Sequence, residues 1–164
     1  MNERMTTNGD RPRGRLLYRL SGLSKSYGDG EVGVMALDGI DLDVHENEFV
    51  VIIGPSGSGK STLLQMLGAL DRPSGGSVRF EGQDLADISD NGLAMIRLET
   101  VGFIFQQFNL IPTLSAQENV EIAMAPRGIN HHERAATARE MLERVGLGAR
   151  TSHLPSQLSG GEQQ

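Results

Sequence analysis

The stretch "FVVIIGPSGSGKST" covers residues 49–62 and decides how the rest of the chain is interpreted. Its first five residues form a continuous apolar run, which is typical of a strand buried on both faces. Glycines then allow the backbone to turn so that several N–H groups point into one concavity. The following residues, 61–70, carry apolar side chains at helical spacing. A G-x-x-x-x-G-K-[ST] motif between a strand and a helix predicts a phosphate-binding loop in an α/β protein.

Each position of this loop has a physical role. The positive end of the following helix attracts anions. Lys60 can reach the β- and γ-phosphates of a nucleotide, and the Ser61 hydroxyl can ligate Mg²⁺. The alternative is a glycine-rich turn that binds nothing. The candidate nucleotide-binding residues are Gly54, Pro55, Ser56, Gly57, Ser58, Gly59, Lys60, Ser61 and Thr62.

Composition limits the possible functions. The 164 residues suffice for one domain. The net charge of −6 argues against a nucleic-acid partner, because such proteins usually carry a basic face. Without cysteine, disulfides and thiolate metal sites are excluded. Residues 1–14 lack the apolar region of a secretory signal, and we expect them to be a disordered lead. The apolar run at 49–53 is too short for a membrane span of ~18 residues, so a membrane role would need a partner.

Strand patterns come first along the chain, and helix patterns follow. Apolar and polar residues alternate over 40–44, and 131–145 has an apolar stripe at helical spacing. Ser115 with Glu118 forms a capping-box pattern. We expect the stretch 86–157 to be an insertion into an α/β core. The remaining expected elements are strands at 16–20, 77–82 and 101–105 and helices at 89–99 and 115–124.

The chain closes on "QLSGGEQQ", residues 157–164. Ser159 and Glu162 have the spacing of a capping box, so a helix is expected to begin here. Bare glycine N–H groups and a serine hydroxyl at a helix start suit an anion. A capped helix start without any ligand is the alternative.

Three motifs together resemble the ATP-binding subunit of an ABC transporter. They are the phosphate-binding loop, "FIFQQFNLIPTLSAQENV" at 103–120 and "LSGGEQQ" at 158–164. The second motif and "YGDGEVGVMALDGIDLDV" at 27–44 are most similar to the lipoprotein-release and macrolide-export branch. The resemblance implies a P-loop NTPase core of RecA-like type, with an N-terminal antiparallel β subdomain, an inserted helical subdomain and the C-terminal part of the core missing.

The resemblance also implies a division of the chain. Residues 15–164 would form an incomplete ATP-binding domain. Within it, 15–85 would be the β subdomain and P-loop core, 86–157 the Q-loop and helical subdomain, and 158–164 the signature motif. Asn47 stands where relatives commonly have glycine, and a turn tolerates this because asparagine visits the left-handed region.

By resemblance, Tyr27 stacks on adenine, although a strand-end tyrosine packed on the core is the alternative. Gln106 matches the Q-loop glutamine that contacts Mg²⁺ and the attacking water. Gln107 is a neighbouring candidate, and a polar loop residue without such a role is a third possibility. The signature residues would bind the γ-phosphate of ATP held by a second copy; they are Leu158, Ser159, Gly160, Gly161, Glu162 and Gln163.

The implied function is that of an ATPase that powers transport. Lys60 and Gln106 would be its catalytic residues within this chain, and ATP with Mg²⁺ its cofactors. The general base would lie outside the chain, so we expect residues 1–164 alone to be inactive. Its partners would be a second ATP-binding subunit and an integral membrane permease, which would hold it at the cytoplasmic face of the membrane. The alternatives are a non-transport ABC-type ATPase or, for this stretch alone, a nucleotide-binding module without turnover.

Overall fold

The computed structural model describes residues 14–28 and 33–164, which divide into two units. The first unit ends at Val101, and the second begins at Gly102. The predicted disordered lead at 1–14 lies outside the described residues, except for Gly14.

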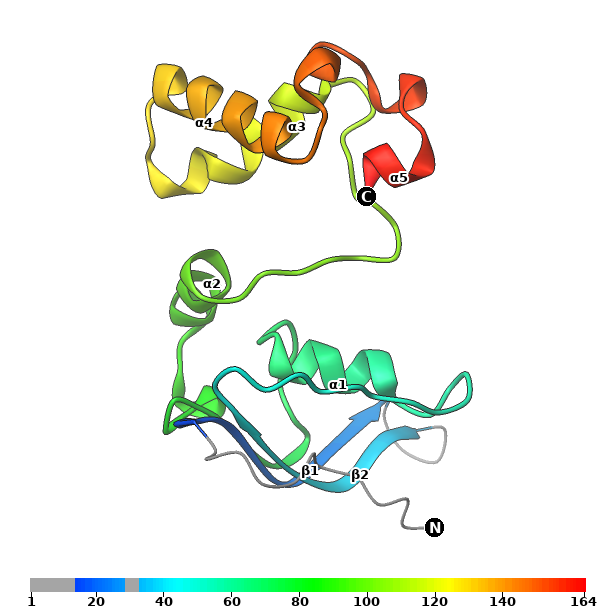
Figure 1. Ribbon diagram of the computed structural model, residues 1–164. Helices are drawn as coiled ribbons and strands as arrows, with labels where there is room; N and C mark the ends of the chain where they lie inside the picture. Colours follow the sequence, from blue (N-terminus) through cyan, green and yellow to red (C-terminus); the bar gives the residue numbers. More distant parts are fainter. Residues whose placement is uncertain (1–13, 29–32) are drawn as a thin grey trace. The chain divides into compact units, whose positions relative to one another are not determined.

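The first unit is an antiparallel sheet covered on one face by a helix (Figure 1). The strand order is β2-β1-β3-β4, so that β1 lies between β2 and β3. This arrangement confirms the predicted antiparallel β region. The elements of the unit are β1 (Leu16–Tyr27), β2 (Val34–His45), α1 (Lys60–Leu67), β3 (Gly75–Phe80), β4 (Gln83–Asp84), the 3₁₀ turn η2 (Leu85–Asp87) and α2 (Asp90–Glu99).

The two long strands extend well beyond the stretches predicted from sequence. The register pairs Leu20 with Leu42 and Tyr27 with Val34, with several bulges between them. The expected alternation is present, because Leu42 is partly buried and the neighbouring Asp43 is exposed. Asn47 adopts a φ of 60° in the turn after β2, as its substitution for glycine predicts. The strands therefore form a bulged antiparallel pair, and Tyr27 is the last residue of β1.

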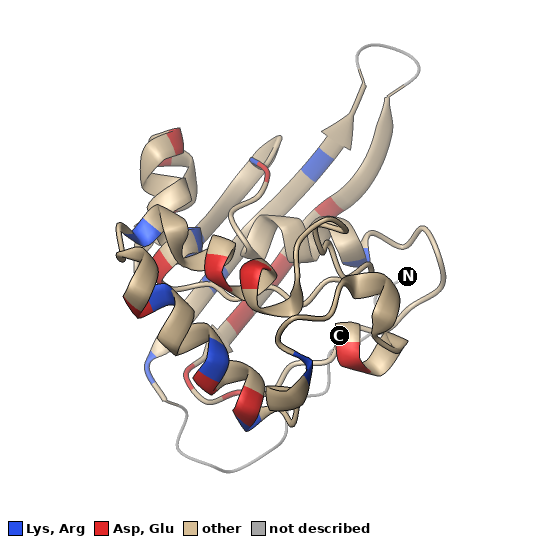
Figure 2. Cartoon of the chain, turned by 90° about the horizontal axis from the view of Figure 1, so that it is seen from above, with Lys and Arg blue, Asp and Glu red and all other residues tan. Residues whose placement is uncertain are grey.

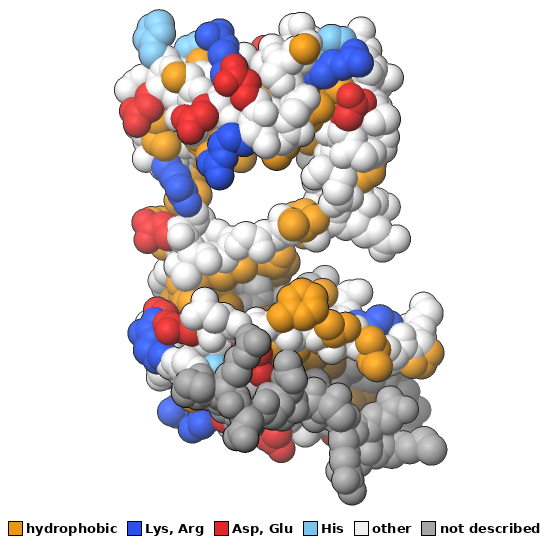
Figure 3. Space-filling view, in the orientation of Figure 1, with side chains coloured by type: hydrophobic (Ala, Val, Ile, Leu, Met, Phe, Trp, Pro, Cys, Tyr) orange, Lys and Arg blue, Asp and Glu red, His pale blue; other side chains and the backbone are white. Residues whose placement is uncertain are grey.

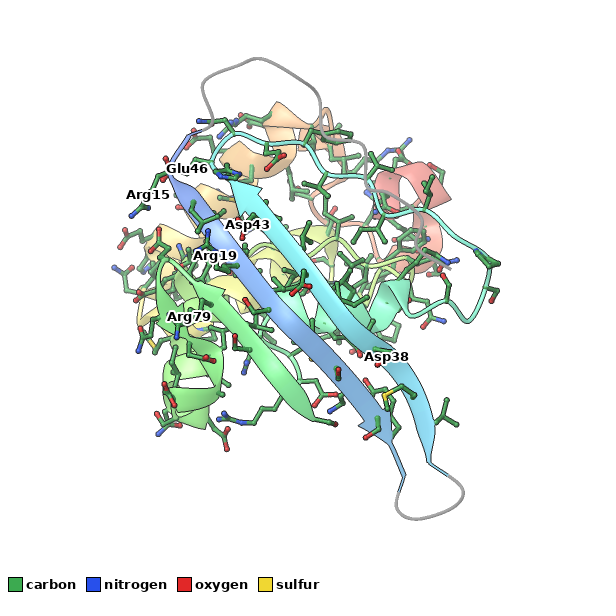
Figure 4. The ribbon with its side chains drawn as sticks, turned by 90° about the horizontal axis from the view of Figure 1, so that it is seen from below. Arg15, Arg19, Asp38, Asp43, Glu46 and Arg79 are labelled. Atoms are coloured by element: carbon green, nitrogen blue, oxygen red, sulfur yellow. The ribbon has the colours of Figure 1, made fainter. Side chains whose placement is uncertain are left out.

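Ion pairs cover the face of the sheet that points away from α1 (Figure 4). The guanidinium of Arg19 on β1 donates two hydrogen bonds of 3.0 Å to the carboxylate of Asp43 on β2. Arg15 Nε donates to Glu46 at 2.9 Å. Solvent screens exposed pairs of this kind, so they mark the solvent face more than they stabilise it.

The opposite face of the sheet carries the core of the unit. Leu63 and Met66 of α1 are almost fully buried against it. The Tyr18 hydroxyl donates to the Leu67 carbonyl at 2.8 Å, and burial raises the pKa of this phenol to about 12. Helix α1 ends at Leu67, and Leu70 is exposed rather than on the predicted apolar face. The Leu70 N–H donates to the Gln65 carbonyl at 2.9 Å, and this bond closes the last turn of the helix. If the helix continued past Leu67, this bond would be lost.

Two predicted strands are absent from the described residues. Neither 49–53 nor 101–105 is in a strand, and the buried-strand predictions were wrong. The side chains of Phe49 and Ile104 are 90% and 88% exposed. Figure 3 shows apolar side chains at the surface in the region of 49–53. A continuous apolar run favours burial, but a strand also requires a neighbour that accepts its backbone hydrogen bonds, and none pairs with these runs here.

The second unit is helical. Ser115 and Glu118 form the predicted capping box of α3, and the Asn130 side chain caps α4. Acidic and basic residues are interspersed along the helices (Figure 2). The elements are α3 (Ala116–Met124), η3 (Ala125–Arg127), α4 (His131–Arg144), η4 (Gly148–Arg150), η5 (Pro155–Gln157) and α5 (Gly160–Gln163).

A small apolar cluster holds this unit together. Ala116 from α3, Leu142 from α4 and Leu158 from the segment before α5 are buried in it. The buried apolar stripe of α4 contains fewer residues than predicted, because the side chains of Met141 and Val145 are 46% and 70% exposed. Among the described residues, no helix combines the length and the apolar character needed to cross a bilayer.

Candidate functional site

The phosphate-binding loop is shaped by its backbone. Gly57 and Gly59 have φ values of 81° and 87°, which few other residues adopt without strain. A Cβ at Gly59 would also overlap the carbonyl oxygen of Ala36 on β2. The same Gly59 is the N-cap of α1 and offers no side chain to the free N–H groups of the helix. The loop is thus packed against β2, with helix donors left for a ligand.

Lys60 is the first residue of α1, and its side chain folds over the loop. Its ammonium donates to the carbonyls of Gly54 at 2.9 Å and Pro55 at 2.7 Å. An ammonium has three donors, so one remains for an incoming anion. The predicted loop residues from Gly54 to Ser58 are all exposed, as a surface phosphate site requires.

A hollow of about 500 Å³ lies between the end of β1 and the first turns of α1. Tyr27 lines it from the strand, and Ser61 and Thr62 line it from the helix. The fold therefore brings Tyr27 together with two predicted site residues, Ser61 and Thr62, that are distant from it in the sequence. Tyr27 is 41% exposed, so part of its surface is open to a ligand.

Sequence reasoning missed the residues that surround Tyr27. Its hydroxyl donates to Asp71 Oδ2 at 3.1 Å and lies 3.3 Å from Gln65 Oε1. Partial burial acts to raise the pKa of Asp71, but hydrogen bonds from Lys25, the Arg72 N–H and Tyr27 outweigh it and hold the pKa below its ordinary value. The sequence contained one signal for Lys25, because residues two positions apart in a strand, such as Lys25 and Tyr27, are expected on the same face. No local signal pointed to Asp71.

Metal binding by this unit would rest on few protein atoms. Among residues 14–28 and 33–164 no group of three or more His, Asp or Glu side chains could hold a metal ion. Ser61 is exposed on the first turn of α1, beside Lys60. Mg²⁺ at nucleotide sites is typically held by one or two protein ligands, water and phosphate oxygens. The donor set fits Mg²⁺ that arrives with a nucleotide.

Gln106 and Gln107 both lie in the second unit, in the non-helical segment that leads to α3. Both side chains are exposed. The structure therefore does not distinguish between the two candidates for the Q-loop glutamine.

The signature residues are fixed by contacts within their own unit. Ser159 Oγ accepts from the Glu162 N–H at 3.4 Å, and Glu162 Oε2 accepts from the Ser159 N–H at 2.8 Å. These bonds form the predicted capping box of α5. Hydrogen bonds from the backbone and then the hydroxyl of Ser159 hold the pKa of Glu162 below its ordinary value. The Gln163 amide donates to the carbonyls of Pro155 and Leu158, both at 2.9 Å.

Leu158 differs from the other predicted signature residues, because its side chain is 8% exposed. It packs with Ala116 and Leu142 in the core of the second unit. Ser159, Gly160 and the following glycine are exposed. The leucine therefore anchors the loop, and the polar residues after it are the ones a ligand can reach.

Comparison with known proteins gives concordant matches. A family model described as ABC transporter matches residues 37–164. An uncharacterised ABC transporter ATP-binding protein of Thermotoga maritima is 54% identical over 140 residues, covering 85% of this chain and 60% of that protein. The macrolide export ATP-binding/permease protein MacB of Marinobacter nauticus is 49% identical over 150 residues, covering 92% of this chain and 23% of that protein.

Among solved structures, the ATP-binding cassette MJ0796 matches with a TM-score of 0.80 and 42% identity. The match covers 90% of this chain and 65% of that one. MJ0796 is described there as a dimer in a post-hydrolysis state bound to ADP and Pi. This likeness confirms the predicted fold class. The chain spans less than two thirds of the length of these relatives.

Proposed function

The chain belongs to the ABC transporter family of ATP-binding proteins, and on this premise we propose that it binds Mg-ATP in the hollow between Tyr27 and the phosphate-binding loop. The observation that carries the proposal is the convergence of Tyr27, Ser61 and Thr62 on one hollow. An aromatic ring at one end and a helix N-terminus at the other suit a base and a phosphate chain respectively.

The residues of this chain would divide the work of binding. Lys60 would place its remaining donor on the β- and γ-phosphates, and the loop N–H groups would surround them. Ser61 would supply a hydroxyl ligand to Mg²⁺, whose charge neutralises the phosphate oxygens. Tyr27 would stack on the adenine, an interaction worth about 1–3 kcal/mol in comparable base–aromatic contacts. Gln106 would orient the attacking water.

We further propose that the complete protein hydrolyses ATP and powers transport through an integral membrane permease. The relatives support this, because MacB is described as an export ATP-binding/permease protein. The permease would hold the ATPase at the cytoplasmic face of the membrane. The signature residues Ser159 to Gln163 would contact ATP on a second copy, in keeping with the dimer described for MJ0796.

The test is the affinity for Mg-ATP of a Lys60→Ala variant of the full-length protein, measured by calorimetry. Removing a charge-assisted contact should cost about 1.5–3 kcal/mol, or roughly 10–150-fold in Kd. Arg79→Ala is the matched control, because this cation lies on β3 with its side chain 57% exposed and does not line the hollow. An unchanged affinity in Lys60→Ala, or an equal loss in both variants, would contradict the proposal.

A further inference from the structure

Lys25 places a nearly buried charge beside the hollow. The sequence contains two lysines, and Lys25 is the one outside the phosphate-binding loop. Its side chain is 11% exposed, and its ammonium donates to Asp71 Oδ1 at 2.7 Å and to the Arg72 carbonyl at 2.8 Å. A buried cation is stable only when it is paired and hydrogen-bonded. The backbone of Lys25 pairs with Leu37 on β2, and two hydrogen bonds hold its ammonium, so the side chain is held at both ends.

This fixed cation lies over the ring of Tyr27. The ammonium is 4.9 Å from the ring centroid, within the range of a cation–π contact. This contact places the two side chains on the same side of β1, at a point where the strand pairing is irregular between Lys25 and Ser26. The cation therefore occupies one face of the ring, while the 41% exposure of Tyr27 leaves part of its surface open.

Asp71 holds the tip of the same ring. It accepts the Tyr27 hydroxyl on Oδ2 and the Lys25 ammonium on Oδ1, so one carboxylate connects both groups. The Arg72 N–H adds a third bond of 2.7 Å to this carboxylate and fixes its orientation. The ring is therefore held at one face and at its tip before any ligand arrives. A side chain that is already ordered loses less entropy on binding.

We propose that Lys25 and Asp71 are positioning residues that hold the exposed part of the Tyr27 ring in place for the base of the nucleotide. This rests on the proposed function, in which the base stacks on Tyr27. The strength of base binding then depends on Lys25 and Asp71, whereas the strength of phosphate binding depends on the P-loop. The two contributions can be separated by a ligand that has the phosphates and lacks the base.

The experiment measures, by calorimetry on the full-length protein, the Kd of Mg-ATP and of Mg-tripolyphosphate for wild type, Lys25→Met and Asp71→Asn. Complete loss of stacking would weaken ATP by about 5–150-fold, and a ring that is merely loosened should lose part of this, about 3–30-fold. Tripolyphosphate affinity should change less than about twofold, because nothing in the P-loop is altered. Lys25→Arg should restore most of the ATP affinity, since arginine can keep both the ion pair and the ring contact.

Arg19→Met is the matched control, because it removes an ion pair from the same strand without touching Tyr27. It should leave both affinities unchanged. Equal losses for ATP and tripolyphosphate in Lys25→Met would show a general structural role and overturn the inference. Unchanged ATP affinity in Lys25→Met and Asp71→Asn would overturn it while the proposed function stands. A wild-type protein that binds neither ligand would overturn the proposed function and the inference with it.

Discussion

The phosphate-binding loop and the signature segment are both rich in serine and glycine, yet they are held in different ways. Side chains of its own residues hold the signature, through the Ser159–Glu162 capping box and the amide of Gln163. The phosphate-binding loop has no side-chain cap at Gly59, and its shape depends on positive φ angles and on contact with β2. In the signature segment N–H groups at the start of the helix are bonded to nearby side chains, whereas in the phosphate-binding loop they are left for a ligand.

This difference shows what each segment can do on binding. In the phosphate-binding loop, Lys60 donates to two carbonyls of the loop and has a third donor left. It can therefore bind a phosphate while the loop keeps its conformation. In the signature, the Ser159 oxygen already accepts from Glu162. The signature segment therefore has its conformation before any ligand binds, and the buried Leu158 holds it to the core of the second unit. Its conformation should depend more on the packing of Leu158 than on the presence of nucleotide.

The largest expected effect tests that anchor. Leu158→Ala should lower the free energy of unfolding of the second unit by about 2–5 kcal/mol, because it leaves a cavity beside Ala116 and Leu142. Denaturant unfolding with hydrogen exchange of the α3 and α4 amides measures the change. Leu154→Ala is the control, since this leucine is 39% exposed and should cost well under half as much. Similar losses in both variants would show that the signature is not anchored through this core.

The next effect separates backbone strain from packing in the phosphate-binding loop. Gly57→Ala and Gly59→Ala both place a Cβ on a residue with positive φ, so both should carry the strain of that conformation. Only at Gly59 does the Cβ also meet the Ala36 carbonyl, whereas nothing lies within 4 Å at Gly57. Gly59→Ala should therefore be less stable than Gly57→Ala by about 1–3 kcal/mol in urea unfolding. Equal stabilities would mean that contact with β2 does not shape the loop.

The smallest effect concerns pH and the signature cap. The pKa of Glu162 is lowered in the folded chain, so its stabilising contribution is present above its ordinary value of 4.5 and is lost as the pH falls through the lowered value. The amide shift of Ser159, followed by NMR from about pH 6 to about pH 3, should report this titration. Glu162→Gln should abolish it and leave the corresponding titration of Ser115 by Glu118 intact. A Ser159 shift that still titrates in Glu162→Gln would rule out the cap as its cause.

The sequence by itself determined the features that depend on neighbours along the chain. The motif at 54–61 predicted a turn that leads into a helix, and the Ser-x-x-Glu spacings predicted the caps of α3 and α5. Asn47 was expected to tolerate the left-handed region, and it does. In each case the atoms that interact lie within a few residues, so the pattern alone contains the geometry.

Only the tertiary structure decided which residues meet across the fold. It showed that 49–53 and 101–105 are not strands, because an apolar run cannot supply the partner that a ladder needs. It placed Asp71 against Lys25 and Tyr27 and buried Leu158 between α3 and α4. These contacts join residues more than ten positions apart. Their formation depends on strand register and helix packing, which are properties of the whole fold and leave no mark at either residue alone.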